Sequence, residues 1–425
     1  MSNEEEVSGL PTRRAALRLL DAVMRMGTPM DQATANATKG LSPPDRALAI
    51  AIAQESLRWS VDLDVLIDSK TKQALPDDSK ARMVLRLALA QILRLGTPPH
   101  AVIATALPLL DKGPRRLVHG VLGSLLRANA ALPELPSLPE SVIMRWHPAW
   151  GDDMVAGAQA ALSEPPPLDL ALRDPASTAH WADILGGESL MPGHVRLPRG
   201  TAVEELQGYD EGAWWVQDLA ASLPGRLLGD GSDKRALDLC AAPGGKTMQL
   251  SAAGFTVTAL DNSARRMDRL MANLERTQLN ADRVTADVME WEPSGTYDAI
   301  LLDAPCSATG TMRRHPDVLQ RIDIKQINNL AALQCAMLDR AAAWVKPGGM
   351  LVYATCSLEP QEGEAQAELF LSKHPDFSTL PATEGELPQG VTANAQGDVR
   401  TMPHMLADKG GMDGFFIARF IRKGA

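Results

Sequence analysis

Apolar residues recur with helical spacing through the first third of the chain. Between residues 11 and 130 they repeat at i, i+3, i+4 and i+7, which places them on one face of an α-helix. Clear examples are Ala16, Leu19, Leu20 and Val23, and Leu85, Ala88, Leu89 and Ile92. We therefore expect five or six helices that pack as an all-α bundle. Periodicity alone leaves open a bundle that is only a scaffold, without a site of its own.

From residue 235 onward, short apolar runs alternate with helical patterns. The strand-like runs are Ala236–Leu239, Phe255–Leu260, Arg283–Ala286, Ala299–Leu302, Met350–Ala354 and Phe415–Ile421. This alternation is typical of a doubly wound, mostly parallel α/β sheet. Residues 379–411 form a long segment with little helical pattern ahead of the last run.

A proline-rich stretch separates these two regions. Residues 131–140 read A-L-P-E-L-P-S-L-P-E, and three prolines in ten residues exclude a helix interior. A helical pattern at Met154–Leu162, a proline-rich break and short strand-like pieces follow. The predicted organisation is a helical domain (1–131), a linker (132–142), a small α/β subdomain (143–225) and a Rossmann-like α/β domain (226–425).

Composition indicates a globular protein of the cytoplasm. The chain has 425 residues, 45% of them hydrophobic and 22% charged. It has no apolar run near the roughly 18 residues that a membrane span needs, and the acidic residues 1–7 do not resemble a signal peptide. The four cysteines show no C-x-x-C pair and no zinc spacing, so we expect reduced thiols and no metal. Cys335, within a helical pattern, is expected in the core. We expect no membrane association, and a monomer.

Charge is spread unevenly along the chain. Its formal net charge of −10 disfavours a nucleic-acid partner at first sight. Residues 1–135, however, hold 17 Lys and Arg against 14 Asp and Glu, whereas the remainder holds 25 against 38. Any contact with RNA must therefore come from local basic patches.

The stretch A-L-D-L-C-A-A-P-G-G-K-T (236–247) has the pattern of a buried strand, a tight turn and a helix N-terminus. Cys240 stands where a Walker A loop needs glycine, and G-x-G-x-x-G is absent. The next strand-like run ends in Asp261, close to the roughly 20-residue distance at which an acid binds a ribose. A nucleoside cofactor is one interpretation, and a tight turn without a ligand is the other.

Acids and thiols follow successive strand-like runs. Asp261, Asp287 and Asp303 come after the second, third and fourth runs. Cys306 lies in D-A-P-C-S-A-T-G and Cys356 in Y-A-T-C-S-L-E-P, each after a strand-like run. Ligands of open α/β sheets bind outside the carboxyl ends of the strands. We therefore expect these side chains to line one crevice, with two buried core cysteines as the alternative.

The motifs D-L-C-A-A-P-G-G-K-T, L-L-D-A-P-C-S-A-T-G, T-C-S and D-G-F-F-I-A-R-F together resemble the Nop/Sun family of RNA cytosine-5 methyltransferases. R-R-A-A-L-R-L-L-D-A-V (13–23), Asp45-Arg46 and E-S-L-R-W-S-V-D-L-D-V-L-I (55–67) resemble a NusB-type RNA-binding domain. His119 and Gly123 depart from the NusB pattern, and Gly363 stands where the Nop/Sun pattern has asparagine.

The resemblance implies a site for S-adenosylmethionine (SAM). Its expected residues are Cys240, Ala241, Ala242, Pro243, Gly244, Gly245 and Lys246 through their backbone, Asp261 at the ribose, Asp287 near the adenine, Arg266 and Asp303. It also implies that Cys356 attacks carbon 6 of cytosine, that Cys306 assists product release, and that Asp303 contacts ring nitrogen 3. The expected substrate is 16S ribosomal RNA, with transfer RNA as the alternative.

Other functions fit fewer of these residues. A DNA cytosine-5 methyltransferase would use Cys306 as nucleophile, and a nucleotide-dependent oxidoreductase would leave both cysteines unexplained. A NusB-like RNA-binding or assembly factor with a degenerate enzyme domain is a non-enzymatic alternative. Arg313, Arg314 and His315 directly follow the Asp303–Cys306 loop, and we expect them to contact RNA phosphates.

Overall fold

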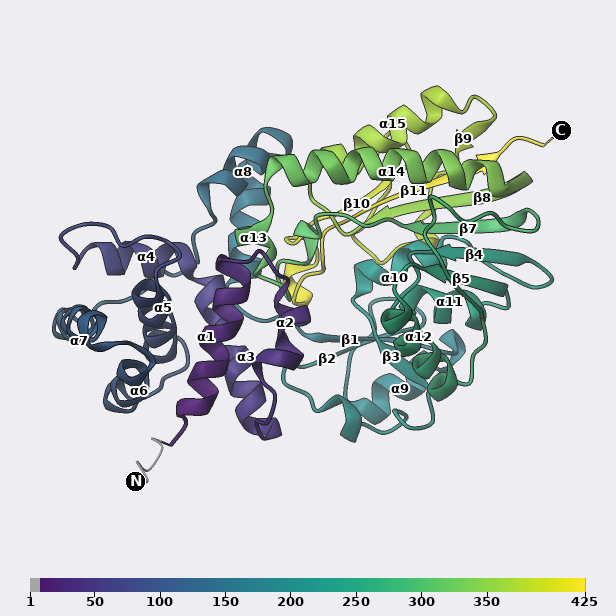
Figure 1. The fold of residues 1–425 in the computed structure, drawn as a ribbon. Coiled ribbons are helices and arrows are strands. Elements are labelled where there is room, and N and C mark those ends of the chain that lie inside the picture. Colours follow the sequence, from purple (N-terminus) through teal and green to yellow (C-terminus); the bar gives the residue numbers. More distant parts are fainter. Residues whose placement is uncertain (1–7, 425) are drawn as a thin grey trace. The chain divides into compact units, whose positions relative to one another are not determined.

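The computed structural model describes residues 8–424, which form two compact units (Figure 1). Among the described residues, the helical unit comprises 8–164 and 314–322, and the sheet unit comprises 165–313 and 323–424. The acidic residues 1–7, whose sequence does not resemble a signal peptide, lie outside the described residues. Among residues 8–424, no helix combines the length and the apolar character that a membrane crossing needs.

The helical unit is built around a central helix whose residues are buried on every side. Its helices are α1 (Leu10–Met24), α2 (Met30–Ala37), α3 (Pro43–Arg58), α4 (Ser60–Asp68), α5 (Lys80–Leu93), α6 (Pro99–Ala106), α7 (Lys112–Arg127), α8 (Glu140–Leu162) and α13 (Val318–Arg321). The central helix is α5, which is buried from Ala81 to Gln91. The all-α prediction is confirmed, but seven α-helices lie within residues 10–127 where five or six were expected. The eight-residue helices α2 and α6 are too short for a periodic pattern.

The predicted linker and the first part of the predicted subdomain belong to the helical unit. Residues 131–139 are irregular, yet Leu138 is buried and Ser137 donates to Asp62 from both its backbone N–H and its Oγ, each at 2.8 Å. Gln159 on α8 donates to the carbonyl of Pro136 at 3.2 Å. The predicted boundary at residue 143 is therefore wrong, because α8 packs with the helices and the small sheet begins only at β1 (Leu168–Leu172).

A short piece of the C-terminal half also folds with the helical unit. In the segment 314–322, Asp317 Oδ2 accepts from the backbone N–H of Met30 at the start of α2, at 3.3 Å. Gln320 Nε2 donates to Ser60 Oγ at 2.7 Å. The predicted domain 226–425 is thus interrupted in space, a feature that a linear reading of the sequence does not contain.

The sheet unit begins with a small antiparallel sheet. Its strands are β1 (Leu168–Leu172), β2 (His194–Leu197) and β3 (Trp214–Val216), in the order β2-β1-β3, and α9 (Thr178–Leu185) accompanies them. A buried ion pair joins β1 to β2, in which the Arg196 guanidinium donates twice to Asp169, at 2.7 and 2.8 Å.

The main sheet has the order β10-β11-β8-β7-β4-β5-β6, with β9 on β11. Its strands are β4 (Arg235–Leu239), β5 (Thr256–Asp261), β6 (Asp282–Thr285), β7 (Tyr297–Asp303), β8 (Val345–Thr355), β9 (Phe377–Thr379), β10 (Val399–Thr401) and β11 (Phe415–Arg422). Strands β4 to β8 pair in parallel, and β9, β10 and β11 pair antiparallel. All six predicted strands and the doubly wound sheet are confirmed.

Helices cover both faces of this sheet. They are α10 (Leu219–Arg226), α11 (Gly245–Ala252), α12 (Ala264–Thr277), α14 (Ile324–Trp344) and α15 (Glu364–Lys373). Apolar residues of α14 and α15 pack on one face, and those of α10 and α11 on the other. From β4 the chain moves outward to β5 and β6, and then returns to β7 and β8 on the other side. The carboxyl end of β4 is therefore the switch point at which such sheets bind ligands.

Candidate active site

The glycine-rich turn lies at this switch point, between β4 and α11. Gly244 has φ +106°, and a Cβ there would lie 2.9 Å from the Leu270 side chain, so both the backbone conformation and the packing require glycine in this turn. Below the turn, Thr247 Oγ1 donates to Asp238 Oδ2 at 2.6 Å. Oδ1 of Asp238 is buried without a hydrogen-bond partner among residues 8–424. Burial raises the pKa of Asp238 to about 7.

Asp261 ends β5 and braces the turn. Its buried carboxylate accepts from the backbone N–H of Ala242 at 3.3 Å, from that of Ser263 at 2.9 Å and from Arg266 Nη2 at 2.9 Å. The predicted neighbours Asp261 and Arg266 are therefore in direct contact. Asp287, by contrast, is exposed beyond β6, where its Oδ1 accepts from the N–H of Met289 at 2.8 Å.

These residues fit a nucleoside cofactor. The turn lies directly before the N-terminus of α11, where backbone N–H groups can receive a ligand, and a fixed carboxylate at a strand end is the acceptor that ribose hydroxyls need. The binding of SAM by residues Cys240 to Lys246 and by Asp261 stays a prediction. The unpartnered Oδ1 of Asp238 is a buried hydrogen-bond acceptor close to the same turn.

Lys246 carries a side-chain function that the sequence analysis missed. Its Nζ lies 2.7 Å from Oδ2 of Asp303, at the end of the neighbouring strand β7, and 5.5 Å from the centre of the Phe415 ring. Burial by itself would lower the pKa of the Lys246 ammonium, but the attraction of Asp303 outweighs it and the pKa is raised. The sequence did contain a signal for this ion pair, because Lys246 lies at the start of a predicted helix and Asp261 and Asp303 each follow a predicted strand.

The two predicted active-site thiols lie side by side. Sγ of Cys306 is 3.4 Å from Sγ of Cys356, and neither residue is fully buried, which disfavours two core cysteines. Backbone bonds join their loops, from Ala304 N–H to the Ala354 carbonyl and from Gly310 N–H to the Cys356 carbonyl, each at 3.0 Å. The hydrogen bond to Cys356, together with burial, raises the pKa of the Cys306 thiol well above its usual range.

The other two cysteines lie elsewhere. Cys335 on α14 is half-buried, with Lys373 Nζ 3.5 Å from its Sγ, so the expectation that it is a core residue is wrong. Cys240 has φ +62° at the start of the glycine-rich turn, and burial with the nearby charge of Asp303 raises its thiol pKa.

The predicted phosphate contact by Arg313 is wrong. Its side chain is only 2% exposed, and its guanidinium donates to the carbonyl of Gly410 and lies 4.0 Å from Asp413. Arg314 and His315 are half-buried and belong to the segment that folds with the helical unit, and their contact with RNA stays a prediction.

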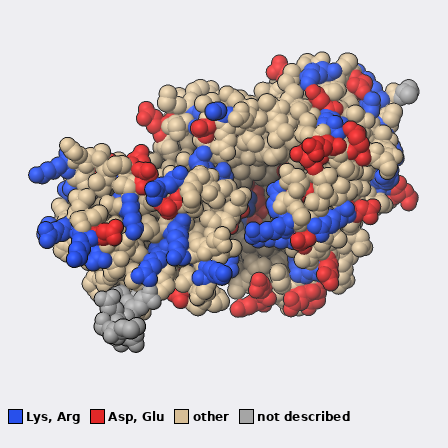
Figure 2. Space-filling model, viewed as in Figure 1, with Lys and Arg blue, Asp and Glu red and all other residues tan. Residues whose placement is uncertain are grey.

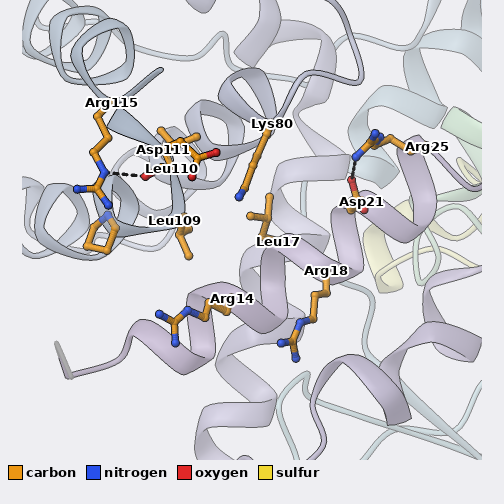
Figure 3. A pocket seen from close by; sticks show the side chains of 11 residues that line it. Arg14, Leu17, Arg18, Asp21, Arg25, Lys80, Leu109, Leu110, Asp111 and Arg115 are labelled. Carbon is orange, nitrogen blue, oxygen red and sulfur yellow. Dashed lines mark hydrogen bonds and ion pairs between the residues drawn. The ribbon is translucent and has the colours of Figure 1, made fainter. Parts of the chain in front are cut away.

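A basic groove lies in the helical unit. It encloses about 560 Å³ and is lined by Arg14, Arg18, Arg25, Lys80 and Arg115, with Asp21, Asp111 and apolar residues of α1 and the loop before α7 (Figure 3). Figure 2 shows Lys and Arg side chains gathered over this part of the surface. Arg25 pairs with Asp21 at 3.1 Å. The excess of cations suits an anionic ligand.

Comparison with known proteins shows the family of the chain. Residues 226–421 match the family of 16S rRNA methyltransferases RsmB/F, and residues 10–127 match the NusB family. The ribosomal RNA small subunit methyltransferase B of Cronobacter sakazakii is 32% identical over 438 residues, covering 97% of this chain and 98% of that one. The crystal structure of PH0851 shares the fold, with a TM-score of 0.74, 22% identity, and coverage of 96% of this chain and 98% of that one. NSun6 from Pyrococcus horikoshii, solved with SFG, covers 68% of this chain and 99% of its own, with a TM-score of 0.59 and 18% identity. The chain therefore belongs to the RsmB/F family of SAM-dependent rRNA methyltransferases.

Proposed function

We propose that the protein methylates carbon 5 of a cytosine in small-subunit ribosomal RNA through a covalent bond between Cys356 and the base. The observation that carries the proposal is the pair of thiols 3.4 Å apart, on the loops that follow β7 and β8. One thiol would suffice as a nucleophile, whereas two adjacent thiols allow one to attack and the other to hold a proton.

The chemistry follows from the nature of cytosine. Carbon 5 is a poor nucleophile until the Cys356 thiolate adds to carbon 6, which moves electron density onto carbon 5 and ring nitrogen 3. Asp303 meets the change at nitrogen 3 by donating a hydrogen bond or a proton, for which it must take up a proton and release its ion pair with Lys246. When bound, SAM supplies an electrophilic methyl group at carbon 5. The carbon 5 proton then departs to a base, the bond between carbon 6 and sulfur breaks, and the electron pair returns to Cys356.

The division of roles follows the family pattern, because either sulfur can donate in the contact between the two thiols. A thiol that hydrogen-bonds to its neighbour favours the thiolate form of that neighbour. Cys356 is assigned as the nucleophile, and Cys306 as the residue that assists the elimination that frees the product. The reverse assignment, as in DNA cytosine-5 methyltransferases, would need the thiolate on Cys306.

A denaturing gel with wild type, Cys306→Ala and Cys356→Ala tests the assignment. Each protein is incubated with SAM and labelled 16S rRNA. We expect Cys306→Ala to accumulate a protein–RNA adduct, because attack and transfer proceed while release stalls. Cys356→Ala should form no adduct and no 5-methylcytosine. An adduct formed by Cys356→Ala but not by Cys306→Ala would refute the assignment, and adducts in neither variant would refute covalent catalysis by this pair.

We further propose that the basic groove of the helical unit binds RNA phosphates, so that this unit helps to select RNA but takes no part in the chemistry. Arg18 and Lys80 line the groove from α1 and from the start of α5 (Figure 3). Each phosphate contact releases counterions, so the affinity for RNA should fall steeply with salt.

The test is charge reversal in the groove. Arg18→Glu with Lys80→Glu should weaken 16S rRNA binding and reduce the salt slope by about 1 for each lost contact, with SAM affinity unchanged. The matched control is the variant Lys423→Glu. Lys423 is an exposed cation just after β11, at the edge of the sheet opposite the two thiols. Equal RNA affinity in the groove variant and the control would remove the groove from RNA binding.

A further inference from the structure

Glu362 is a fully buried carboxylate that lies six residues after Cys356. It ends a short 3-10 turn (Pro360–Glu362) and accepts hydrogen bonds from two loops and a helix. Ser357 Oγ donates to it at 2.6 Å, and the backbone N–H of Ser307 donates at 2.9 Å, with Ser307 Oγ closer still. Gln334 Nε2 on α14 donates at 3.0 Å.

These partners are the immediate neighbours of the two thiols. Ser307 follows Cys306 in the chain, and Ser357 follows Cys356. The two hydroxyls also lie 3.0 Å from one another. A single carboxylate therefore fastens the loop after β7 to the loop after β8 at the residues beside the sulfur atoms.

Glu362 is itself fixed from several sides. Its backbone carbonyl accepts from Tyr353 Oη at 2.7 Å and from Thr355 Oγ1 at 3.1 Å, both on β8. Gln334 also donates to the carbonyl of Pro305 at 2.8 Å, so the residues on both sides of Cys306 are held by this cluster. A buried carboxylate is costly unless its oxygens are satisfied, and here four donors satisfy them.

We propose that Glu362 is a positioning residue that, through Ser307 and Ser357, holds the Cys306 and Cys356 sulfur atoms at their reactive separation. The proposal rests on the proposed function for its catalytic consequence, but the separation of the thiols is a property of the folded chain alone. Because Glu362 is fully buried, it acts through these neighbours and not on the base. Removing it frees both loops, and a displacement of about 1 Å at reacting atoms costs roughly 100-fold in rate.

The variants are Glu362→Ala, which removes all four contacts, and Glu362→Gln, which keeps an oxygen for the Ser307 N–H and for Gln334. Glu386→Ala is the matched control. Glu386 is another carboxylate of the sheet unit that accepts several hydrogen bonds, from Arg419 at 2.6 and 3.0 Å and from Thr383 at 2.8 and 2.9 Å. Its loss should reduce stability without moving the thiols.

Two measurements separate positioning from a merely structural role. The first is binding of phenylarsine oxide, which forms two arsenic–sulfur bonds only where two thiols lie close together, and Cys306→Ala gives the value for a broken pair. The second is single-turnover adduct formation on 16S rRNA, alongside KM for RNA and the SAM dissociation constant.

We expect Glu362→Ala to bind the arsenical as weakly as Cys306→Ala and to lose about 100-fold in the adduct rate, with KM and SAM affinity unchanged. Glu362→Gln should retain most of the arsenical affinity and most of the adduct rate. If Glu362→Ala keeps the arsenical affinity and rate of Glu386→Ala, the proposal is wrong. Should Glu362→Ala not fold, Ser307→Ala with Ser357→Ala takes its place and must show the same two losses. If Glu362→Ala loses arsenical binding but the wild-type protein does not methylate 16S rRNA, the positioning role stands and the proposed function is refuted.

Discussion

The ion pair between Lys246 and Asp303 gives a prediction whose size follows from the structure. Lys246 Nζ is 2.7 Å from Asp303 Oδ2, with the lysine side chain 11% exposed and the aspartate 30% exposed. Breaking a fully buried pair by removing one partner costs about 3–5 kcal/mol, whereas an exposed pair is worth about 0–1 kcal/mol. For this half-buried geometry we expect a coupling energy of about 2 kcal/mol, between those limits.

A double-mutant cycle measures this coupling. The proteins are wild type, Lys246→Met, Asp303→Asn and the double variant, since methionine keeps the length of lysine without its charge. Hydrogen exchange of the β4 and β7 amides reports the opening free energy of the sheet unit by itself, which global denaturation of a two-unit chain does not. The single variants should each lose stability, and the double variant should lose less than their sum.

The control cycle uses the ion pair of Arg283 and Asp268, which belongs to the same unit and has a similar distance between nitrogen and oxygen. These side chains are 2.8 Å apart but 34% and 69% exposed. We expect their coupling to be about 0–0.5 kcal/mol. If the Lys246–Asp303 coupling is no larger than this control value, the ammonium is not paired with Asp303 in solution and the reasoning from burial is refuted.

Three further predictions concern the same edge of the sheet. Asp261→Ala should weaken SAM binding about 10- to 150-fold by calorimetry, from the loss of a charge-assisted hydrogen bond, and unchanged affinity in a folded variant would take Asp261 out of the site. The pKa of Asp238 is raised to about 7 in the folded state, so the folded protein binds an extra proton and wild-type stability should fall as pH rises from about 4 through about 7. Asp238→Asn should flatten this fall in unfolding experiments at pH 5.5 and 8, and an unaltered pH profile would contradict the assignment. Gly310→Ala would place a Cβ 1.9 Å from the Gly414 carbonyl oxygen, so we expect a loss of about 1–3 kcal/mol in thermal unfolding, which an unchanged midpoint would disprove.

The sequence predicted that the two thiols lie at the same edge of the sheet. Cys306 and Cys356 each follow an apolar run, and parallel strands place their carboxyl ends at one edge of a sheet. The strands β7 and β8 are neighbours, so the loops that follow them meet. Without the strand order, however, the sequence could not show that these two strands are adjacent, and the separation of 3.4 Å depends on that adjacency.

Other features were not predictable because they depend on contacts between distant residues. The helix α8 contains Pro148 and a non-helical Gly151, which break the periodic pattern, so only its second half was expected as a helix. Arg313 was expected at the surface as part of a charge run, but the carbonyl of Gly410, almost a hundred residues later, satisfies it inside the fold. Glu362 reads as an ordinary surface acid until its donors from Ser307 and Ser357 are known.

Burial also explains why net charge is a poor guide to RNA binding in this protein. Residues 136–425 hold 25 Lys and Arg against 38 Asp and Glu, which taken alone disfavours a polyanionic partner. Several of these acids, however, are buried inside the sheet unit, and so are several of its arginines: Asp169, Asp238, Asp261, Glu362, Asp398 and Asp413, and Arg196, Arg313, Arg400 and Arg419. A buried acid that pairs with a buried arginine, as Asp169 does with Arg196, adds no net charge to the unit. The cations of the basic groove, by contrast, line an open surface of the helical unit (Figure 2). The potential that an RNA backbone meets is therefore set by where the charges lie, and not by the formal net charge alone.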